Sequence, residues 1–242
     1  VHNYAVPRPF TVMVRVLGPV LRRWSWIAVS RTARDLLPTQ WDVELVPNPI
    51  EPGPASHGDT RPAPCTVVYL AGTDHPVKGF DLLADIVRAT PADAARFVVH
   101  AERSRRSDHP TSRAVWADLE GPLADRVEIR PFVSDVEPVL AAADLVLVPS
   151  RRESFNRVLA EALGRGVPVV ASDIAAHREH FEEGDVGRTF RAGDAADAAR
   201  AVTELALDVD ERRRCADRGR RHVDSFAPDR VASRLLAAWS GS

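Results

Sequence analysis

The fold is decided by residues 145–171, which read LVLVPSRRESFNRVLAEALGRGVPVVA. This stretch begins with an apolar run at 145–148 and ends with a second one at 168–171. Between them, residues 155–163 place apolar side chains at the spacing of a helix. A short apolar strand, a helix and another short apolar strand are typical of a parallel sheet, because its strands are buried on both faces.

The same alternation of strands and helices extends on both sides of this stretch. Strands are expected at 66–70, 97–99 and 127–129, and helices at 80–89, 111–119 and 135–143. The run at 168–171 is the last clear strand, and residues 195–239 predict two or three further helices. We therefore predict an α/β fold built on a doubly wound, Rossmann-like parallel sheet.

A change in composition marks a domain boundary. Residues 47–64 hold six prolines and two glycines, with little apolar content, which predicts a linker or a long surface loop. We therefore expect an incomplete N-terminal domain at 1–50, a linker at 51–64 and a larger domain at 65–242.

The N-terminal part has short elements of its own. Residues 26–29 and 43–46 each predict a strand. Ser30 follows the first of them, and a serine there favours an N-cap for a helix that continues to Leu37.

The composition excludes several classes of protein. The chain has 242 residues, 45% of them hydrophobic, which is enough to bury a sizeable core. Its formal net charge is -2, so no basic excess supports general nucleic-acid binding. Cys65 and Cys215 lie far apart, which indicates a reducing, cytoplasmic location and argues against a zinc site. No apolar run reaches the roughly 18 residues of a membrane span.

The segment after strand 66–70 favours an anion site, because ligands of open parallel sheets bind at the carboxyl ends of the strands. Gly72 permits close approach of a ligand to the backbone. Lys78 lies at or just before the next helix, where amide groups, the helix dipole and an ammonium group together attract an anion. It is the single lysine among 32 basic residues, so its position favours a compact charge over a planar guanidinium. A chance surface lysine is the alternative.

Two glutamates follow the strand at 145–148. Ser154 is the expected N-cap of the next helix, so Glu153 lies at the helix mouth and Glu161 about two turns further on. At about 1.5 Å per residue they are roughly 10 Å apart, which suits two polyols on either side of an anion held by the helix N-terminus. Taken alone, either glutamate is more simply a residue that balances the helix dipole or a solvated helix residue.

Three features together resemble glycosyltransferase family 4, the large group of retaining GT-B enzymes. They are the segment KGF at 78–80, the E-x7-E spacing of Glu153 and Glu161, and the run GRGVPVVAS at 164–172. Further likenesses lie at 28–30, 46–48, 132–134, Glu179 and Gly187. The resemblance covers about residues 26–239. It implies that 65–242 is the donor-binding domain of a GT-B enzyme and that 1–50 is a remnant of its acceptor-binding domain.

The resemblance also implies a role for each matching residue. Lys78 and Glu153 are the expected catalytic residues, neutralising the donor diphosphate and contacting the donor sugar. The expected donor-binding residues are Gly72, Thr73, Lys78, Phe132, Val133, Glu153, Asn156, Arg157, Val158 and Glu161. Within this set, Glu161 binds the ribose, Phe132 and Val133 frame the base, and residues 156–158 offer backbone amides to the phosphates.

The chemistry implied by the resemblance needs no metal and no separate cofactor. The donor is a nucleoside-diphosphate sugar, UDP- or GDP-linked, and the acceptor is a glycan, lipid or small-molecule hydroxyl. Preorganised donors aimed at the leaving diphosphate lower the barrier as its negative charge grows. Retention proceeds by attack on the same face, with the leaving phosphate taking the acceptor proton, so no enzymic nucleophile is expected.

Several positions depart from the family pattern. Thr73 stands where the family usually has arginine, so one diphosphate cation is missing unless Arg151 or Arg152 replaces it. His100-Ala101-Glu102 replaces the usual glycines, and the histidine either reshapes the donor pocket or fills it.

The front of the chain departs furthest from the family. The dipeptide His2-Asn3 resembles a segment well inside the family's N-terminal domain, so we expect a fragment or a truncated protein. We expect an apolar patch near Leu17, Val20 and Trp24. Peripheral contact with the inner face of a membrane is common in the family, but the basic amphipathic stretch at 8–23 is weak evidence for it.

Two other functions compete with a transferase. A catalytically incomplete nucleotide-binding remnant is favoured by Thr73 and by the missing front. A GT-B-like epimerase requires an acid/base cluster that the sequence does not show. The nucleobase, the sugar, the acceptor and the oligomeric state stay open.

Overall fold

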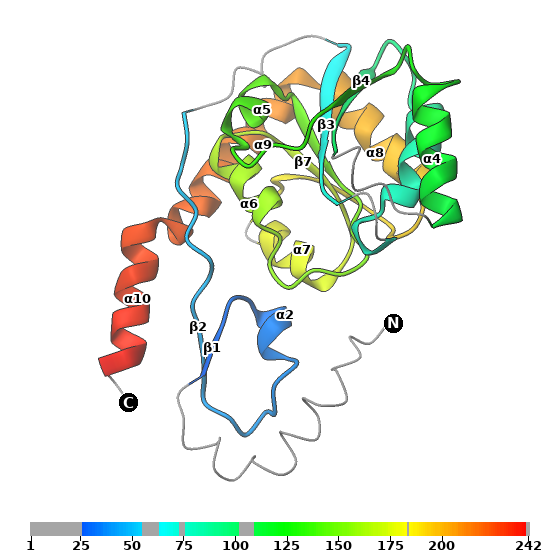
Figure 1. Ribbon diagram of the computed structural model, residues 1–242. Coiled ribbons are helices and arrows are strands. Elements are labelled where there is room, and N and C mark those ends of the chain that lie inside the picture. Colours follow the sequence, from blue (N-terminus) through cyan, green and yellow to red (C-terminus); the bar gives the residue numbers. More distant parts are fainter. Residues whose placement is uncertain (1–25, 55–62, 73–75, 102–108, 183, 241–242) are drawn as a thin grey trace.

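The computed structural model describes residues 26–54, 63–72, 76–101, 109–182 and 184–240. Within these residues, a six-stranded sheet has the order β5-β4-β3-β6-β7-β8 (Figure 1). The strands are β3 (Cys65–Leu70), β4 (Ala95–His100), β5 (Val127–Arg130), β6 (Leu145–Val148), β7 (Val169–Ser172) and β8 (Gly187–Phe190). Every neighbouring pair runs parallel. The strand order reverses between β3 and β6, which confirms the doubly wound fold.

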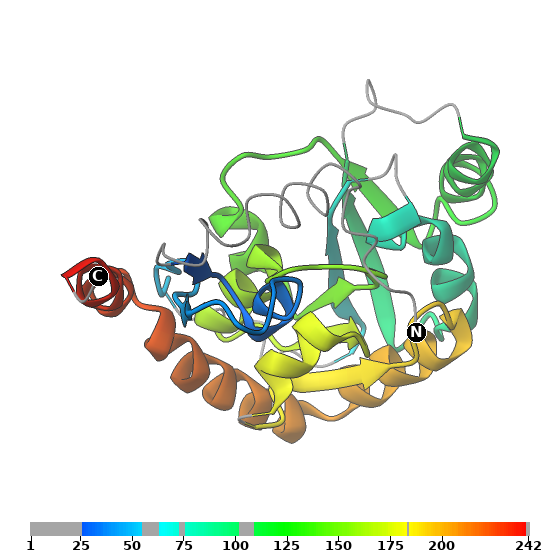
Figure 2. The ribbon, with the colours of Figure 1, turned by 90° about the horizontal axis from the view of Figure 1, so that it is seen from below.

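Helices cover both faces of this sheet (Figure 2). One face packs against α3 (Leu83–Ala89), α4 (Pro110–Glu120) and α8 (Ala195–Leu207), and the other against α5 (Glu137–Ala142), α6 (Arg157–Gly164) and the end of α9 (Val209–Val223). Successive strand residues point to opposite faces. In β3, Val67 and Tyr69 therefore enter the first core, and Val68 and Leu70 enter the second.

Two helix boundaries differ from the prediction. The helix expected at 80–89 is divided into a 3-10 turn, η3 (Phe80–Leu82), and α3. The helix expected from Phe155 begins at Arg157, because Asn156 caps it by accepting a hydrogen bond from the Leu159 amide at 3.1 Å. The prediction of Ser154 as the N-cap is therefore wrong. Asparagine tolerates the left-handed backbone that turns the chain into the helix at this point.

The sheet continues beyond the apolar run at 168–171, which is not the last strand. The strand β8, GRTF, pairs with β7 at the edge of the sheet. Apolar patterning misses it because Arg188 and Thr189 are partly or fully exposed, as edge-strand residues often are. Glycine is needed at 187, since a Cβ atom there would lie 1.8 Å from the Val169 carbonyl oxygen.

The N-terminal part forms a small unit. The strands β1 (Trp26–Ala28) and β2 (Val43–Leu45) pair in parallel, and the rings of Trp26 and Trp41 stack with centroids 4.5 Å apart. Ser30 caps α2 (Arg31–Arg34) as predicted, by accepting from the Ala33 amide at 2.9 Å. The helix ends at Arg34 rather than at Leu37.

This small unit contacts the larger domain through α7 (Ala175–Phe181). The Glu179 carboxylate accepts hydrogen bonds from the amides of Arg31, at 2.9 Å, and Thr32, at 2.7 Å. The Ser30 hydroxyl donates to the Ser154 carbonyl oxygen. The small unit therefore lies directly against the loop that precedes α6.

The C-terminal helix returns to the N-terminal unit. After α9, the turn η5 (Asp224–Phe226) leads into α10 (Pro228–Ser240), which lies beside β1 and β2 in both views (Figures 1 and 2). The segment that leads from the N-terminal unit into the larger domain meets this turn at Ile50. Ile50 is buried, and its amide donates to the Phe226 carbonyl oxygen at 2.9 Å. The start of the proline-rich segment is thus packed on the larger domain, and the division at 50 and 64 stays a prediction.

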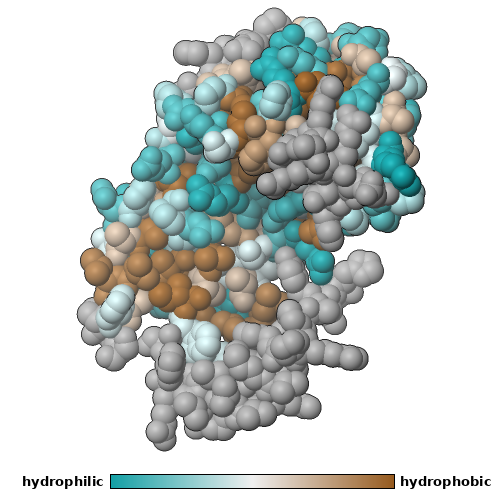
Figure 3. Space-filling view, viewed as in Figure 1, coloured by the Kyte–Doolittle hydropathy of each residue, from teal (hydrophilic) through white to brown (hydrophobic). Residues whose placement is uncertain are grey.

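Apolar side chains gather on the surface of α10 (Figure 3). Leu235, Leu236 and Trp239 are among the exposed large apolar residues, and Trp239 is 80% exposed. The patch predicted near Leu17, Val20 and Trp24 lies outside the described residues. None of the helices in the described ranges has both the length and the apolar content of a membrane span.

Candidate donor site

The site is built around an ion pair between two strand ends. The Lys78 ammonium lies 2.7 Å from Oε1 of Glu153, although 75 residues separate the two in sequence. Lys78 follows β3, Glu153 follows β6, and these strands are neighbours at the point where the strand order reverses. The two residues predicted to be catalytic are therefore brought together.

Lys78 is held by the backbone around it. It ends the 3-10 turn η2 (Pro76–Lys78), and Gly79 follows with a φ of 73°. A Cβ atom at Gly79 would lie 2.1 Å from the Pro149 carbonyl oxygen, so only glycine lets the two loops approach. The Tyr69 hydroxyl lies within hydrogen-bond distance of the carbonyl oxygens of Gly72, at 3.1 Å, and Lys78, at 3.3 Å.

Arg151 anchors the same segment. Both terminal nitrogens of its guanidinium lie 2.6 Å from the Asp81 carboxylate, and one also donates to the Pro76 carbonyl oxygen at 2.7 Å. Its amide donates to the Val77 carbonyl oxygen. The guanidinium is thus bound to Asp81, which argues against Arg151 as the replacement cation for position 73. Thr73 itself lies outside the described residues.

Glu153 is fixed through one of its two oxygens. Besides Lys78, the Ser150 hydroxyl donates to Oε1 at 2.8 Å, and the Asn156 side-chain amide donates to the same atom at 3.2 Å. Among the described residues, no donor contacts Oε2. The side chain is 11% exposed, and these contacts orient the carboxylate.

The N-terminus of α6 offers backbone amides. In the part of the chain that the structure describes, the amides of Asn156, Arg157 and Val158 donate to no protein acceptor. Unsatisfied amides and the helix dipole together make a site for an anion. This agrees with the phosphate-binding role that the family resemblance implies for these three residues.

Glu161 lies on the next turns of α6 and pairs with Arg157 at 2.7 Å. The Glu161 side chain is 15% exposed and the Arg157 side chain 67%, so the arginine extends into solvent. Glu161 borders a cavity of about 510 Å3, together with Ser134, Asp135 and residues 49–51. The structure thus brings Glu161 close to the segment that follows Phe132 and Val133.

The two residues expected to frame the base differ in burial. Phe132 is 59% exposed, and Val133 packs against the second core. Neither borders the cavity that Glu161 lines. An exposed ring beside a fixed backbone is suited to stacking on a flat ligand.

His100 fills space at the end of β4 and anchors the loop that carries Phe132. It is 3% exposed, and its Nδ1 lies 3.0 Å from the Pro131 carbonyl oxygen. A carbonyl oxygen only accepts, so Nδ1 carries the proton. Burial lowers the pKa of the ring, and Nε2 has no protein partner in the described ranges.

Sequence reasoning missed the side chains that hold Glu153. Ser150 and the side-chain amide of Asn156 both contact it, and His177 contacts Asn156 in turn at 3.0 Å. The sequence contains only weak evidence for these contacts. Asparagine at the start of a helix favours capping and a left-handed backbone, but nothing in the sequence connects it to a histidine in the following helix.

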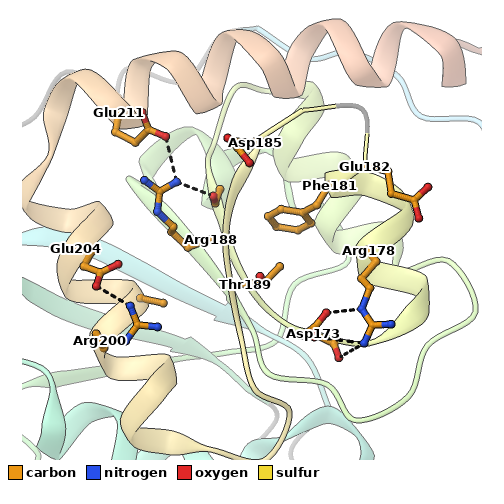
Figure 4. A pocket seen from close by; sticks show the side chains of 12 residues that line it. Asp173, Arg178, Phe181, Glu182, Asp185, Arg188, Thr189, Arg200, Glu204 and Glu211 are labelled. Atoms are coloured by element: carbon orange, nitrogen blue, oxygen red, sulfur yellow. Dashed lines mark hydrogen bonds and ion pairs between the residues drawn. The ribbon is translucent and has the colours of Figure 1, made fainter.

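A larger hollow lies beside β8 (Figure 4). Its volume is about 580 Å3, and its basic residues are already paired, Arg178 with Asp173, Arg188 with Glu211 and Arg200 with Glu204. Each of these arginines is therefore bound to a carboxylate, as Lys78 is. The strand ends combine the Lys78–Glu153 pair with the amides of residues 156–158, which donate to no protein acceptor among the described residues, so they are the better candidate site.

His177 makes the stability of the chain depend on pH. Burial lowers the pKa of its imidazole to about 4, so between pH 6.5 and 4 the unfolded state binds more protons than the folded state. Stability is therefore expected to fall on acidification, by about 2 kcal/mol between pH 7.5 and 5. Urea unfolding at both pH values measures the difference. His177→Gln is the control, because glutamine does not titrate, and an equal loss in this variant would contradict the assignment.

Comparison with known proteins agrees with this geometry. The profile of the family Glycosyl transferases group 1 matches residues 64–208, more than half of the chain. A D-inositol 3-phosphate glycosyltransferase from Nocardia farcinica is 30% identical over 182 residues, covering 73% of this chain and 40% of that enzyme. A phosphatidyl-myo-inositol mannosyltransferase from Mycobacterium leprae is 28% identical over 246 residues, covering 95% of this chain and 63% of that enzyme.

Solved structures share the fold. Anabaena HepE in complex with UDP superposes with a TM-score of 0.80 at 20% identity, covering 96% of this chain and 68% of that one. Sucrose-phosphate synthase from Thermosynechococcus elongatus gives a TM-score of 0.79 at 22% identity, over 100% of this chain and 64% of that one. The chain therefore spans 40% and 63% of the two curated relatives. Because the family profile matches more than half of its length, the chain belongs to the group 1 glycosyl transferases.

Proposed function

We propose that this chain carries the donor site of a retaining glycosyltransferase, which moves a hexose from a nucleoside-diphosphate sugar to a hydroxyl of a glycan, lipid or small molecule. The observation that carries the proposal is the Lys78–Glu153 pair at 2.7 Å, beside the free amides that begin α6. The relatives are named glycosyl- and mannosyltransferases, and HepE was solved with UDP and with UDP-glucose. These names support a nucleotide-sugar donor.

The diphosphate lies, in this proposal, between the ammonium of Lys78 and the N-terminus of α6. As the bond between the sugar carbon and the phosphate oxygen breaks, the diphosphate gains negative charge. An ammonium and oriented amides stabilise that charge without reorganising, so they lower the barrier without a metal ion. The acceptor oxygen attacks from the same face, and its proton passes to the leaving phosphate.

Glu153 and Glu161 bind the two polyols of the donor. Oε1 of Glu153 is held by three donors, so Oε2 is the oxygen that accepts from a sugar hydroxyl. Glu161 accepts from the ribose diol in the cavity that it lines. Two carboxylates on opposite sides of an anion site explain why the E-x7-E spacing suits a nucleotide sugar.

Thermal unfolding in the presence of UDP, GDP, ADP and dTDP tests the donor site and identifies its base. A ligand at 100 times its dissociation constant adds about 2.7 kcal/mol to the stability. For a chain of this size, that raises the melting temperature by roughly 2–4 °C per kcal/mol. If none of the four diphosphates shifts the folded protein, the donor site is excluded.

Glu161→Gln is expected to weaken UDP or GDP binding by about tenfold or more, because hydrogen bonds to a charged group contribute about 1.5–3 kcal/mol. Calorimetric titration measures the affinity, and the 2′-deoxy nucleotide reports on the same contact. The wild type should bind the 2′-deoxy nucleotide more weakly than the ribonucleotide, and the variant should bind the two equally. Glu204→Gln, in the hollow beside β8, is the matched control. Retained discrimination in Glu161→Gln would assign the ribose to another residue.

A catalytically incomplete nucleotide-binding remnant is the second candidate. It is favoured by the commitment of Arg151 to Asp81, which argues against this arginine as the second diphosphate cation. The two functions differ in turnover, because a remnant binds nucleotide but releases no sugar. Single-turnover release of UDP from UDP-glucose, or of GDP from GDP-mannose, separates them.

A further inference from the structure

The side-chain amide of Asn156 uses all of its hydrogen-bonding groups at the mouth of α6. Its oxygen accepts from the Leu159 amide at 3.1 Å. Its nitrogen lies 3.2 Å from Oε1 of Glu153 and 3.0 Å from Nε2 of His177. One amide group therefore connects the helix N-terminus, the oriented glutamate and a histidine of α7.

The tautomer of His177 follows from its other contact. Nδ1 lies 2.8 Å from the Ser172 carbonyl oxygen, which only accepts, so Nδ1 carries the hydrogen. The neutral ring then has a lone pair on Nε2, and this atom accepts the hydrogen bond from Asn156. His177 is fully buried, and its low pKa keeps the ring neutral at pH 7.

The same end of β7 supports Glu153 along a second path. The Ser172 hydroxyl donates to the Ser150 carbonyl oxygen, and the Ser150 hydroxyl donates to Oε1 of Glu153 at 2.8 Å. His177 and Ser172 therefore connect the strand end to Asn156 and Ser150, two of the three residues whose side chains contact the glutamate. A buried network in which the members have partners fixes geometry more strictly than apolar packing does.

The backbone of Asn156 shows why this support is needed. Its φ of 62° and ψ of 83° lie in the left-handed region, which asparagine tolerates better than most residues but less readily than glycine does. The three side-chain contacts compensate for that conformation. Without the His177 acceptor, one amide hydrogen of Asn156 is left buried without a partner, and the orientation of the amide toward Glu153 is no longer fixed.

We infer that His177 is a positioning residue of the donor site, whose neutral imidazole orients the Asn156 side-chain amide and, through it, Glu153. This inference rests on the proposed function, since Glu153 must contact the donor sugar for the effect to appear. His177 does not touch the donor. Its loss therefore lowers the affinity contributed by the sugar more than the affinity for the nucleotide alone.

The test compares the calorimetric dissociation constants of UDP and UDP-glucose, and of GDP and GDP-mannose, for the full chain. His177→Phe keeps a ring but removes the acceptor. It is expected to reduce the gain in affinity due to the sugar by about tenfold, the size of a hydrogen bond to a charged group. The affinity for the nucleotide alone should change by less than about threefold. His177→Gln places an amide oxygen near the position of Nε2 and should restore most of the gain.

Two further variants separate positioning from general damage. His222→Phe makes the same change at another buried histidine, which contacts His180 rather than Asn156, and should keep the sugar-dependent gain. Asn156→Gly suits the left-handed backbone but removes the contacts to His177, to Glu153 and to the Leu159 amide. Like His177→Phe, it should lose the gain in affinity due to the sugar. It also provides a test of the Asn156 contacts if the phenylalanine variant does not fold.

Each outcome decides the matter. In the Glu153→Gln background, His177→Phe should cause no further loss of the sugar-dependent gain, and an additive loss would overturn the inference. A normal gain in folded His177→Phe or in Asn156→Gly would also overturn it, as would an equal loss in His222→Phe. If the wild type binds none of the four ligands, the proposed function fails and this inference falls with it. A wild type that binds, with variants that keep the gain, removes the inference alone.

Discussion

Lys78→Ala is expected to remove most of the stabilisation that a nucleoside diphosphate gives to the folded chain. Removing one partner of a hydrogen-bonded charge pair costs about 2–5 kcal/mol, which weakens binding at least thirtyfold. If the dissociation constant rises a hundredfold, a ligand dose that stabilises the wild type by about 2.7 kcal/mol stabilises the variant by only about 0.4 kcal/mol. Thermal unfolding with the diphosphate that shifts the wild type measures the difference.

The same variant should fold normally without ligand, because the Lys78 side chain is 39% exposed. Arg200→Ala is the control for removing a positive charge, since Arg200 pairs with Glu204 beside β8 and lies outside the site. The nucleoside diphosphate should raise the melting temperature of Arg200→Ala by as much as it raises that of the wild type. A full shift in Lys78→Ala would show that the diphosphate binds elsewhere.

Gly79→Ala is expected to lower the stability by about 3 kcal/mol or more and to abolish the nucleotide shift. The φ of 73° is unfavourable for alanine by about 1–2 kcal/mol. In addition, the new Cβ would lie 2.1 Å from the Pro149 carbonyl oxygen, so one of the two loops must move. These loops carry Lys78 and Glu153, and their separation would break the 2.7 Å ion pair. Urea unfolding at constant m-value measures the loss of stability.

Gly193→Ala separates the two causes. Its φ of 89° is also left-handed, but a Cβ atom there meets nothing within 4 Å. It should lose only the conformational part, about 1–2 kcal/mol, and keep the nucleotide shift. If Gly79→Ala and Gly193→Ala lose the same stability, the close approach of Gly79 to Pro149 contributes nothing to the loss.

The sheet was predictable where its strands are buried on both faces. The runs at 66–70 and 145–148 are continuous and apolar, so their pattern identifies them without tertiary information. The edge strand β8 has Arg188 and Thr189 at its centre, so it has no continuous apolar run. Apolar patterning does not detect such a strand, and only the family resemblance pointed to Gly187.

The site was predictable at the level of charge and spacing. Lys78 and Glu153 follow neighbouring strands, so sheet topology alone brings them to one edge. Their exact support was not predictable, because it depends on contacts across the fold. The sequence does not show that Arg151 binds Asp81 or that Asn156, rather than Ser154, caps α6. The first contact joins side chains 70 residues apart, and the second depends on the left-handed backbone of Asn156.

The hydrogen bond between Ile50 and Phe226 has a mechanical consequence. The chain crosses between the small N-terminal unit and the larger domain twice, near residue 50 and near residue 227, and this bond ties the two crossings together at 2.9 Å. The two crossings are therefore restrained relative to each other. Because the Ser30 hydroxyl also donates to the Ser154 carbonyl oxygen, the small unit is attached to the larger domain at a further point, on the backbone next to Glu153.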